Sequence, residues 1–139
     1  AIPSDIGRLT TLRELKVGFN CFIGTIPSEI GFLTNLESHT MSTNSLVGPI
    51  PRVVGRLQNL REMWLHSNDL TGQLPSEVGL AKNTTHLSYA NNLFSGELPT
   101  EISMLTKLRV VDLNSNMFSG EIPTQFSKLG SIAEFYLHM

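Results

Sequence analysis

The apolar residues of this 139-residue chain recur with a fixed period of 24 residues, which is also the separation of Asn20 from Asn44 and of Asn44 from Asn68. Within each period they follow the pattern L-x-x-L-x-x-L-x-L-x-x-N-x-L, where L stands for an apolar residue, as in the segment from Leu105 to Phe118. A fixed period of this length is typical of a solenoid, in which each repeat stacks on the one before it. The chain therefore divides into units that begin at positions 2, 26, 50, 74, 98 and 122.

Short strands are predicted in the middle of each unit. There the apolar residues alternate with other residues, so they point to one side of an extended chain and their neighbours point to the other. Because the same segment recurs in every unit, the strands should stack in parallel, one per unit, into a single sheet. We expect them to be centred near Leu15, Met41, Leu65, Tyr89, Leu113 and Leu137.

An asparagine follows the strand segment at the same place in five units. Its side chain carries an acceptor oxygen and two amide hydrogens, so it can bond to backbone groups of its own turn and of the neighbouring unit. The three interior copies, Asn44, Asn68 and Asn92, should therefore be almost fully buried. The whole column consists of Asn20, Asn44, Asn68, Asn92 and Asn116.

Turn residues recur at both ends of the unit. A Pro is the second residue of all six units, and a Gly closes each of the five complete ones. Ser or Thr follows the Pro in five units, which favours the N-terminus of a short helix or 3₁₀ turn. With segments such as 70–75, which reads L-T-G-Q-L-P, the unit resembles the plant-type leucine-rich repeat.

This resemblance extends over residues 1–139 as a single array of about six repeats. It implies an α/β solenoid: a right-handed superhelix with one parallel β-sheet on its concave face and short helical or 3₁₀ turns outside. Receptor-like kinase ectodomains and polygalacturonase-inhibiting proteins carry repeats of this kind. The resemblance therefore implies a protein that binds other proteins or peptides.

Two units depart from the apolar pattern at inward positions. His39 stands where the pattern has Leu, and no second His, Cys or acid shares its inward column, which disfavours a metal site. We expect a core histidine bonded to a nearby carbonyl, or a locally loosened unit. In the fourth unit, Tyr89 should recover the volume lost at Ala81 and Thr84.

The residues between the inward leucines should face outward on the concave surface. Read one repeat at a time, these columns bring aromatic and hydrogen-bonding side chains onto neighbouring units. A Trp in such surroundings is typical of a binding hot spot, so the predicted partner site consists of Trp64, His66, His86, Asp112 and Tyr136. Beside it, charges alternate from unit to unit, which should give a solvated series of salt bridges between Arg13, Glu37 and Arg61.

Net charge and the lack of catalytic motifs reduce the number of functions that fit the sequence. A formal net charge of −2 gives no electrostatic case for binding nucleic acid. The sequence has no G-x-S-x-G, H-E-x-x-H, P-loop or G-x-G-x-x-G motif. Alternation should turn His66 and Ser67 to different sides of the strand, which disfavours a triad with Asp69. We therefore expect no enzyme, no cofactor and no metal.

Three non-enzymatic functions fit this pattern. The first is a recognition module that binds a protein or peptide on its concave face, as receptor-like ectodomains do, and it is the function we expect. The second is a secreted enzyme inhibitor similar to polygalacturonase-inhibiting proteins. The third is a structural subunit held in a larger multiprotein complex. What flanks the array, such as a transmembrane span and kinase or cysteine caps, distinguishes these classes.

The location follows less directly from the residues. The resemblance implies an extracellular protein, or one attached to a membrane through a segment outside this chain, with an organelle or the cytosol as alternatives. Cys21 is the only cysteine, and both Ala1 and Met139 interrupt a unit, so we expect part of a longer protein. The sequon at Asn83 predicts an exposed asparagine that carries a glycan if the protein is secreted.

Overall fold

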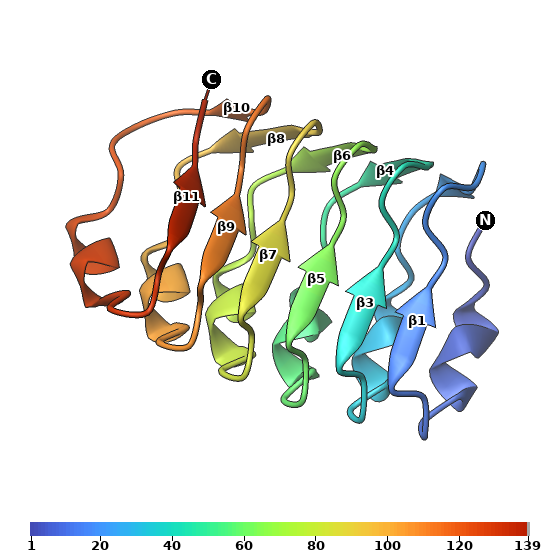
Figure 1. Ribbon diagram of the computed structural model, residues 1–139. Coiled ribbons are helices and arrows are strands. Elements are labelled where there is room, and N and C mark those ends of the chain that lie inside the picture. Colours follow the sequence, from blue (N-terminus) through green and yellow to red (C-terminus); the bar gives the residue numbers. More distant parts are fainter. Residues whose placement is uncertain (139) are drawn as a thin grey trace.

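The computed structural model describes residues 1–138 as one stacked solenoid (Figure 1), and Met139 lies outside the described residues. The concave side is a parallel sheet with one strand from each unit, in the order β1-β3-β5-β7-β9-β11. This confirms the predicted leucine-rich repeat architecture. The strands are β1 (Glu14–Lys16), β3 (Ser38–Thr40), β5 (Glu62–Trp64), β7 (His86–Ser88), β9 (Val110–Asp112) and β11 (Glu134–Tyr136).

The strands of this sheet pair in a register of one full repeat, which aligns Leu15 with His39 and His39 with Met63. Except in the first unit, each strand centre lies two residues before the predicted one. The strand is only three residues long because the chain soon leaves the extended conformation: Thr43 and Ser67, for example, have φ angles of 56° and 58°. The apolar residues at the predicted centres, such as Met41 and Leu65, are still buried, but they lie just beyond the strand.

A second sheet runs along the solenoid, so the expectation of one strand per unit in a single sheet was wrong. Each of its parallel strands begins shortly after an asparagine of the column in the sequence, and the strands pair in the order β10-β8-β6-β4-β2. Each strand has two to four residues and most end on a Gly with φ near 80°, so in the sequence it resembles a turn. The strands are β2 (Ile23–Gly24), β4 (Ser45–Gly48), β6 (Asp69–Gly72), β8 (Leu93–Gly96) and β10 (Met117–Phe118).

The remaining side of each unit is a 3₁₀ helix of five residues, as predicted. The Pro before five of the six helices is extended, and the helix closes with bonds such as Ile30 N–H to the Pro27 carbonyl (3.1 Å). The Ser or Thr is the first residue of the helix, as predicted, and no side-chain capping bond is made there. No helix within residues 1–138 is long and apolar enough to cross a membrane. The helices are η1 (Ser4–Arg8), η2 (Ser28–Phe32), η3 (Arg52–Arg56), η4 (Ser76–Leu80), η5 (Thr100–Met104) and η6 (Thr124–Lys128).

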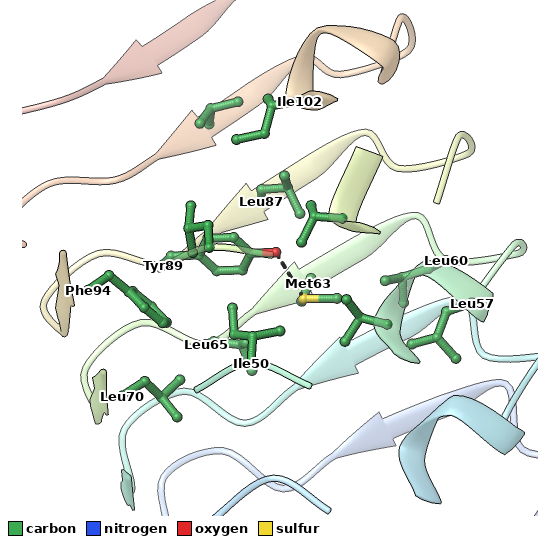
Figure 2. Packing of buried hydrophobic residues seen from close by; sticks show 14 of the residues in the cluster. Ile50, Leu57, Leu60, Met63, Leu65, Leu70, Leu87, Tyr89, Phe94 and Ile102 are labelled. Atoms are coloured by element: carbon green, nitrogen blue, oxygen red, sulfur yellow. Dashed lines mark hydrogen bonds between the residues drawn. The ribbon is translucent and has the colours of Figure 1, made fainter. Parts of the chain in front are cut away.

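The leucines of successive units pack into one continuous core between these faces. Figure 2 shows that Tyr89 lies inside this core, where its hydroxyl donates to Met63 Sδ at 3.1 Å. Burial raises the pKa of Tyr89, so it stays neutral. The smaller Thr84 and Ala81 of the same unit are also buried, and the Thr84 hydroxyl donates to the Ala81 carbonyl at 2.7 Å. The large Tyr89 ring thus shares the buried interior of the fourth unit with the smaller side chains of Ala81 and Thr84.

The asparagine column bonds each unit to the one before it. Asn68 Oδ1 accepts from Leu46 N–H at 3.0 Å, and Asn68 Nδ2 donates to the carbonyls of Met41 (3.0 Å) and Leu65 (3.1 Å). The same bonds recur at Asn44, Asn92 and Asn116. Asn68 and Asn92 are buried as predicted, but Asn44 is only half-buried, because a single unit lies on its N-terminal side.

His39 lies at the centre of β3 and is fully buried. Neither of its ring nitrogens has a hydrogen-bond partner among residues 1–138, so the expected bond to a carbonyl is absent from this region. Burial lowers the pKa of His39 to about 4, because the charged ring would have to enter an apolar core. The histidine is therefore a neutral core residue with two unsatisfied polar atoms.

Replacing Asn68 by Ala should lower the free energy of unfolding by about 1 to 3 kcal/mol, because the backbone groups it bonds would stay buried without partners. Asn20 provides the control, since it is exposed and bonds only to carbonyls of its own turn. Urea unfolding of both variants measures the difference. Equal losses for Asn20→Ala and Asn68→Ala would contradict a role in joining units.

Acid should weaken the fold through His39. The unfolded chain protonates this residue near pH 6.5 and the folded chain only near pH 4, so the stabilisation is complete above about pH 6.5 and is lost as the pH falls toward 4. The loss amounts to about 3 kcal/mol. His39→Leu should remove this dependence and raise the free energy of unfolding at pH 7 by about 1 kcal/mol or more. Unfolding curves between pH 4 and 7.5 test this, and parallel pH profiles would contradict it.

Candidate functional site

Three of the predicted partner-site residues meet on the concave face. Trp64 and His86 stack with ring centroids 5.9 Å apart and planes at 29°, and His66 approaches Trp64 edge-on at 6.5 Å. Trp64 and His66 are two residues apart and therefore share a face. The strand register pairs Glu62 with His86, which makes His86 a diagonal neighbour of Trp64. All three rings are half-buried, so each retains surface for a partner.

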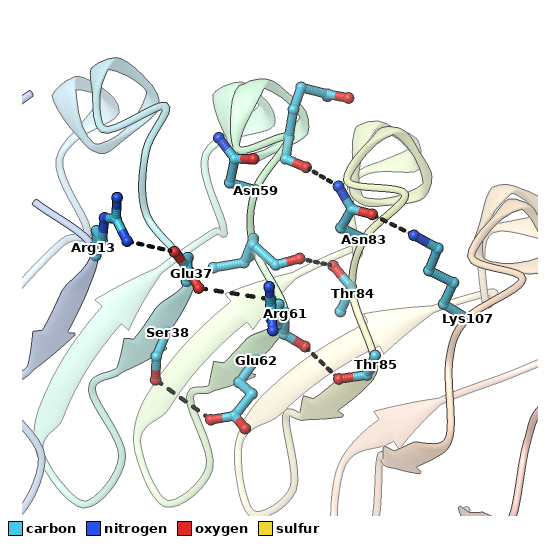
Figure 3. A network of polar contacts seen from close by, with 12 residues as sticks. Arg13, Glu37, Ser38, Asn59, Arg61, Glu62, Asn83, Thr84, Thr85 and Lys107 are labelled. Atoms are coloured by element: carbon cyan, nitrogen blue, oxygen red, sulfur yellow. Dashed lines mark hydrogen bonds and ion pairs between the residues drawn. The ribbon is translucent and has the colours of Figure 1, made fainter. Parts of the chain in front are cut away.

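Glu62 belongs to this cluster, although sequence reasoning did not select it. Its Oε2 accepts from Trp64 Nε1 at 3.4 Å and from Ser38 Oγ at 3.4 Å, and Figure 3 shows the second contact. The signal was available, because Glu62 lies two residues before Trp64 and must share its face. The carboxylate, together with His86, fixes the orientation of the indole. We call Trp64, His66, His86 and Glu62 the indole cluster.

Asp112 and Tyr136 form a separate group on the same face. They are paired in the register of β9 and β11, whereas Asp112 and Trp64 are separated by Ser88 of β7. Tyr136 is 45% exposed and its hydroxyl donates to Glu134 Oε2 at 3.1 Å, a contact that raises the pKa of Tyr136. The buried Ser88 lies between the two groups. The five predicted residues therefore occupy one face but not one contact cluster.

His66 and Ser67 lie closer than strand alternation predicts. His66 Nδ1 is 3.3 Å from Ser67 Oγ, because Ser67 has a φ of 58° and does not follow the strand geometry. Asp69 begins β6, and within residues 1–138 no hydrogen bond joins it to His66. Nor do any three His, Cys, Asp or Glu side chains in this part of the chain come together as a metal site.

The predicted series of charges is present along the edge of the sheet (Figure 3). Glu37 lies 3.7 Å from Arg13 and 3.6 Å from Arg61, measured between carboxylate oxygen and guanidinium nitrogen. The two arginine side chains are 77% and 68% exposed, which confirms a solvated series. Such pairs contribute little to stability, at most about 1 kcal/mol each. The series does not by itself indicate a binding site.

A second asparagine column, missed in the sequence, lies on the same edge. Asn35 donates to the Thr10 carbonyl and Asn59 to the Thr34 carbonyl, both at 2.9 Å. In the next unit Asn83 Nδ2 donates to the Gln58 carbonyl at 2.8 Å, and Asn83 Oδ1 accepts from Lys107 Nζ at 2.6 Å. These bonds make Asn83 half-buried, so it is less exposed than the sequence predicted. The spacing of these asparagines by one repeat was the signal for this column.

Comparison with known proteins supports the repeat assignment. The Leucine Rich Repeat family profile matches residues 59–80 and 107–129. The chain is similar to the ectodomain of the Arabidopsis thaliana receptor kinase GASSHO1/SCHENGEN3 in complex with CASPARIAN STRIP INTEGRITY FACTOR 2, with 34% identity and a TM-score of 0.98. It is also similar to the Arabidopsis receptor kinase HAESA in complex with the peptide hormone IDA and the co-receptor SERK1, with 32% identity and a TM-score of 0.94.

These similarities cover almost all of the chain but only a part of each relative. The matches to GASSHO1/SCHENGEN3 and HAESA include 99% and 98% of this chain, yet 16% and 23% of those chains. A leucine-rich repeat protein of Leptospira interrogans is 30% identical over 99% of this chain and 34% of its own, with a TM-score of 0.89. A search of curated protein sequences found no match.

The stacking of Trp64 on His86 should affect the fluorescence emission of Trp64. This residue is the only tryptophan and therefore the only source of indole fluorescence. His86→Ala should uncover the stacked face of the indole and shift its emission to longer wavelength. His138→Ala provides the control, because His138 lies three units away on the same face. Emission spectra of the folded variants measure the shift. A spectrum unchanged by His86→Ala would contradict the stacked arrangement.

Proposed function

Because the chain is a leucine-rich repeat protein similar to plant receptor kinase ectodomains, we propose that it is a non-catalytic recognition module. It binds a protein or peptide on the concave sheet, with the indole cluster as the anchor of the interface. Asp112 and Tyr136 contribute polar contacts at the C-terminal side of the same surface. The module acts outside the cell, as the ectodomains it resembles do, and any membrane attachment comes from a segment outside residues 1–139.

The observation that carries this proposal is the way Trp64 is held. Its ring stacks on His86, its N–H points to Glu62, and one part of the ring remains accessible. Tryptophan buries a large area on binding, and an indole whose orientation is already fixed loses little conformational freedom when a partner packs on it. Such residues dominate the binding free energy of many interfaces.

The surroundings of the cluster suit an extended chain. Ser88 of β7 and Ala90 just beyond it are small and buried, so this unit presents little side-chain bulk between the indole cluster and Asp112. A ligand segment that crosses the strands can approach the sheet there, with an apolar group on Trp64 and a hydrogen-bonding group on Asp112. The peptide hormone IDA, named with the Arabidopsis receptor kinase HAESA, supports a peptide as the class of occupant.

Trp64→Ala tests the proposal with peptides selected from a random display library on the immobilised wild-type chain. The variant should raise the Kd of the selected peptides about 30-fold, equivalent to about 2 kcal/mol. Unfolding curves should change little, because Trp64 lies on the surface of the sheet. Titration of each peptide by calorimetry or by indole fluorescence of the wild type measures the affinities.

Phe32→Ala is the matched control, since Phe32 is an aromatic residue on the outer helices that is 53% exposed. Its Kd values should stay within about twofold of the wild type. Peptides that bind Trp64→Ala normally but lose affinity for Phe32→Ala would overturn the concave-face proposal. Contacts on the outer turns would then favour the structural subunit, whereas binding to a secreted enzyme through the concave face would favour the inhibitor.

A further inference from the structure

The sequon Asn83-Thr84-Thr85 lies at the turn that leads into β7. The turn is closed by a bond from Thr84 N–H to the Ala81 carbonyl at 3.0 Å, which brings Asn83 to the rim of the sheet. The Thr85 hydroxyl donates to the Arg61 carbonyl at 3.1 Å. Asn83 and Thr85 are thus half-buried at the rim of the sheet, whereas Thr84 between them is buried.

A polar hollow of about 330 Å³ adjoins Asn83 on this rim. Its volume is at the lower end of the range for small-molecule sites. The lining offers both kinds of hydrogen-bonding group: donors on Arg61, Asn59 and Lys107, and acceptors on Glu37 and Thr85 (Figure 3). The complete lining is Glu37, Asn59, Arg61, Asn83, Thr85 and Lys107.

We propose that Asn83 carries an N-linked glycan and that the first sugar of this glycan lies in the hollow. The modification rests on the extracellular location in the proposed function, but it does not depend on a ligand at Trp64. A sugar presents hydroxyl and acetamido groups that both donate and accept hydrogen bonds, which the mixed lining can satisfy. The side chains around the hollow also hold one another, since Glu37 is bracketed by Arg13 and Arg61.

The bonds of Asn83 leave the reacting atom available. Its Nδ2 has two hydrogens, of which one donates to the Gln58 carbonyl. In the transfer, Nδ2 loses the other proton and forms a bond to the anomeric carbon of a lipid-diphosphate-linked oligosaccharide. The bond from that carbon to the diphosphate oxygen breaks, and the lipid diphosphate leaves without any change of oxidation state. Oδ1 remains an amide oxygen and can still accept from Lys107.

Occupancy is tested by secreting the chain from a eukaryotic cell with a cleavable signal sequence. Enzymatic deglycosylation in ¹⁸O-water followed by mass spectrometry should find labelled Asp at position 83. Thr85→Ser keeps the sequon and should keep the label, whereas Thr85→Val should abolish it. An unmodified Asn83 in the secreted wild type would overturn the proposal. Because secretion is imposed, that outcome would not bear on the native location or on binding at Trp64.

The position of the first sugar is tested by the rate of enzymatic glycan release from the folded glycoprotein. Arg61→Ala removes a side chain of the hollow and should speed release about fivefold or more. Arg13→Ala is the matched control, because Arg13 pairs with the same Glu37 but does not line the hollow. Rates in denaturant should be equal for all variants. Equal release from the folded wild type and Arg61→Ala would show that the sugar lies outside the hollow.

Discussion

The fold depends on the bonds to the preceding unit that are made by Asn44, Asn68, Asn92 and Asn116. A single unit cannot bury its own leucines, so the array is stable only when units stack at a fixed separation. The residue before each asparagine has a left-handed φ of 52–58°, which costs roughly 1–2 kcal/mol for a residue with a side chain. The bonds of Asn68 to Leu46, Met41 and Leu65 offset that cost and hold the turn against its neighbour. Among residues 1–138 no unit lies before that of Asn20, and there Asn20 is exposed with bonds to its own turn alone.

The same fixed separation creates the indole cluster. Trp64 and His86 come from different units, and they stack because the register places Glu62 beside His86. The inward residues are committed to the core, so the outward columns alone can vary in chemistry without loss of packing. His39 shows the converse: a polar ring in an inward column loses its hydrogen bonds, and burial lowers its pKa. Binding chemistry on this fold is therefore confined to the outward columns and the rims.

The sequence predicted the elements that depend on side-chain periodicity. Alternation identified the concave strands and the face of Trp64, and the Pro column identified the outer 3₁₀ turns. It did not predict the second sheet, because β4 and β6 are held by backbone pairing and end in a Gly that resembles a turn. Nor did it predict the partners of each side chain. Those depend on rotamers and on neighbouring units, as the contact of Trp64 with Glu62 illustrates.

The two surfaces on this side of the solenoid suit different occupants. The indole cluster offers a rigid aromatic face with its N–H already bonded, which favours apolar contact with a partner that can dissociate. The hollow beside Asn83 is lined by charged, amide and hydroxyl side chains, so an occupant exchanges hydrogen bonds with water for hydrogen bonds with the protein and gains only a small free energy from each. Free ligands gain little from such a site. A sugar tethered covalently at Asn83 does not lose translational freedom again when it enters, which is why the rim suits a glycan and the sheet suits a partner.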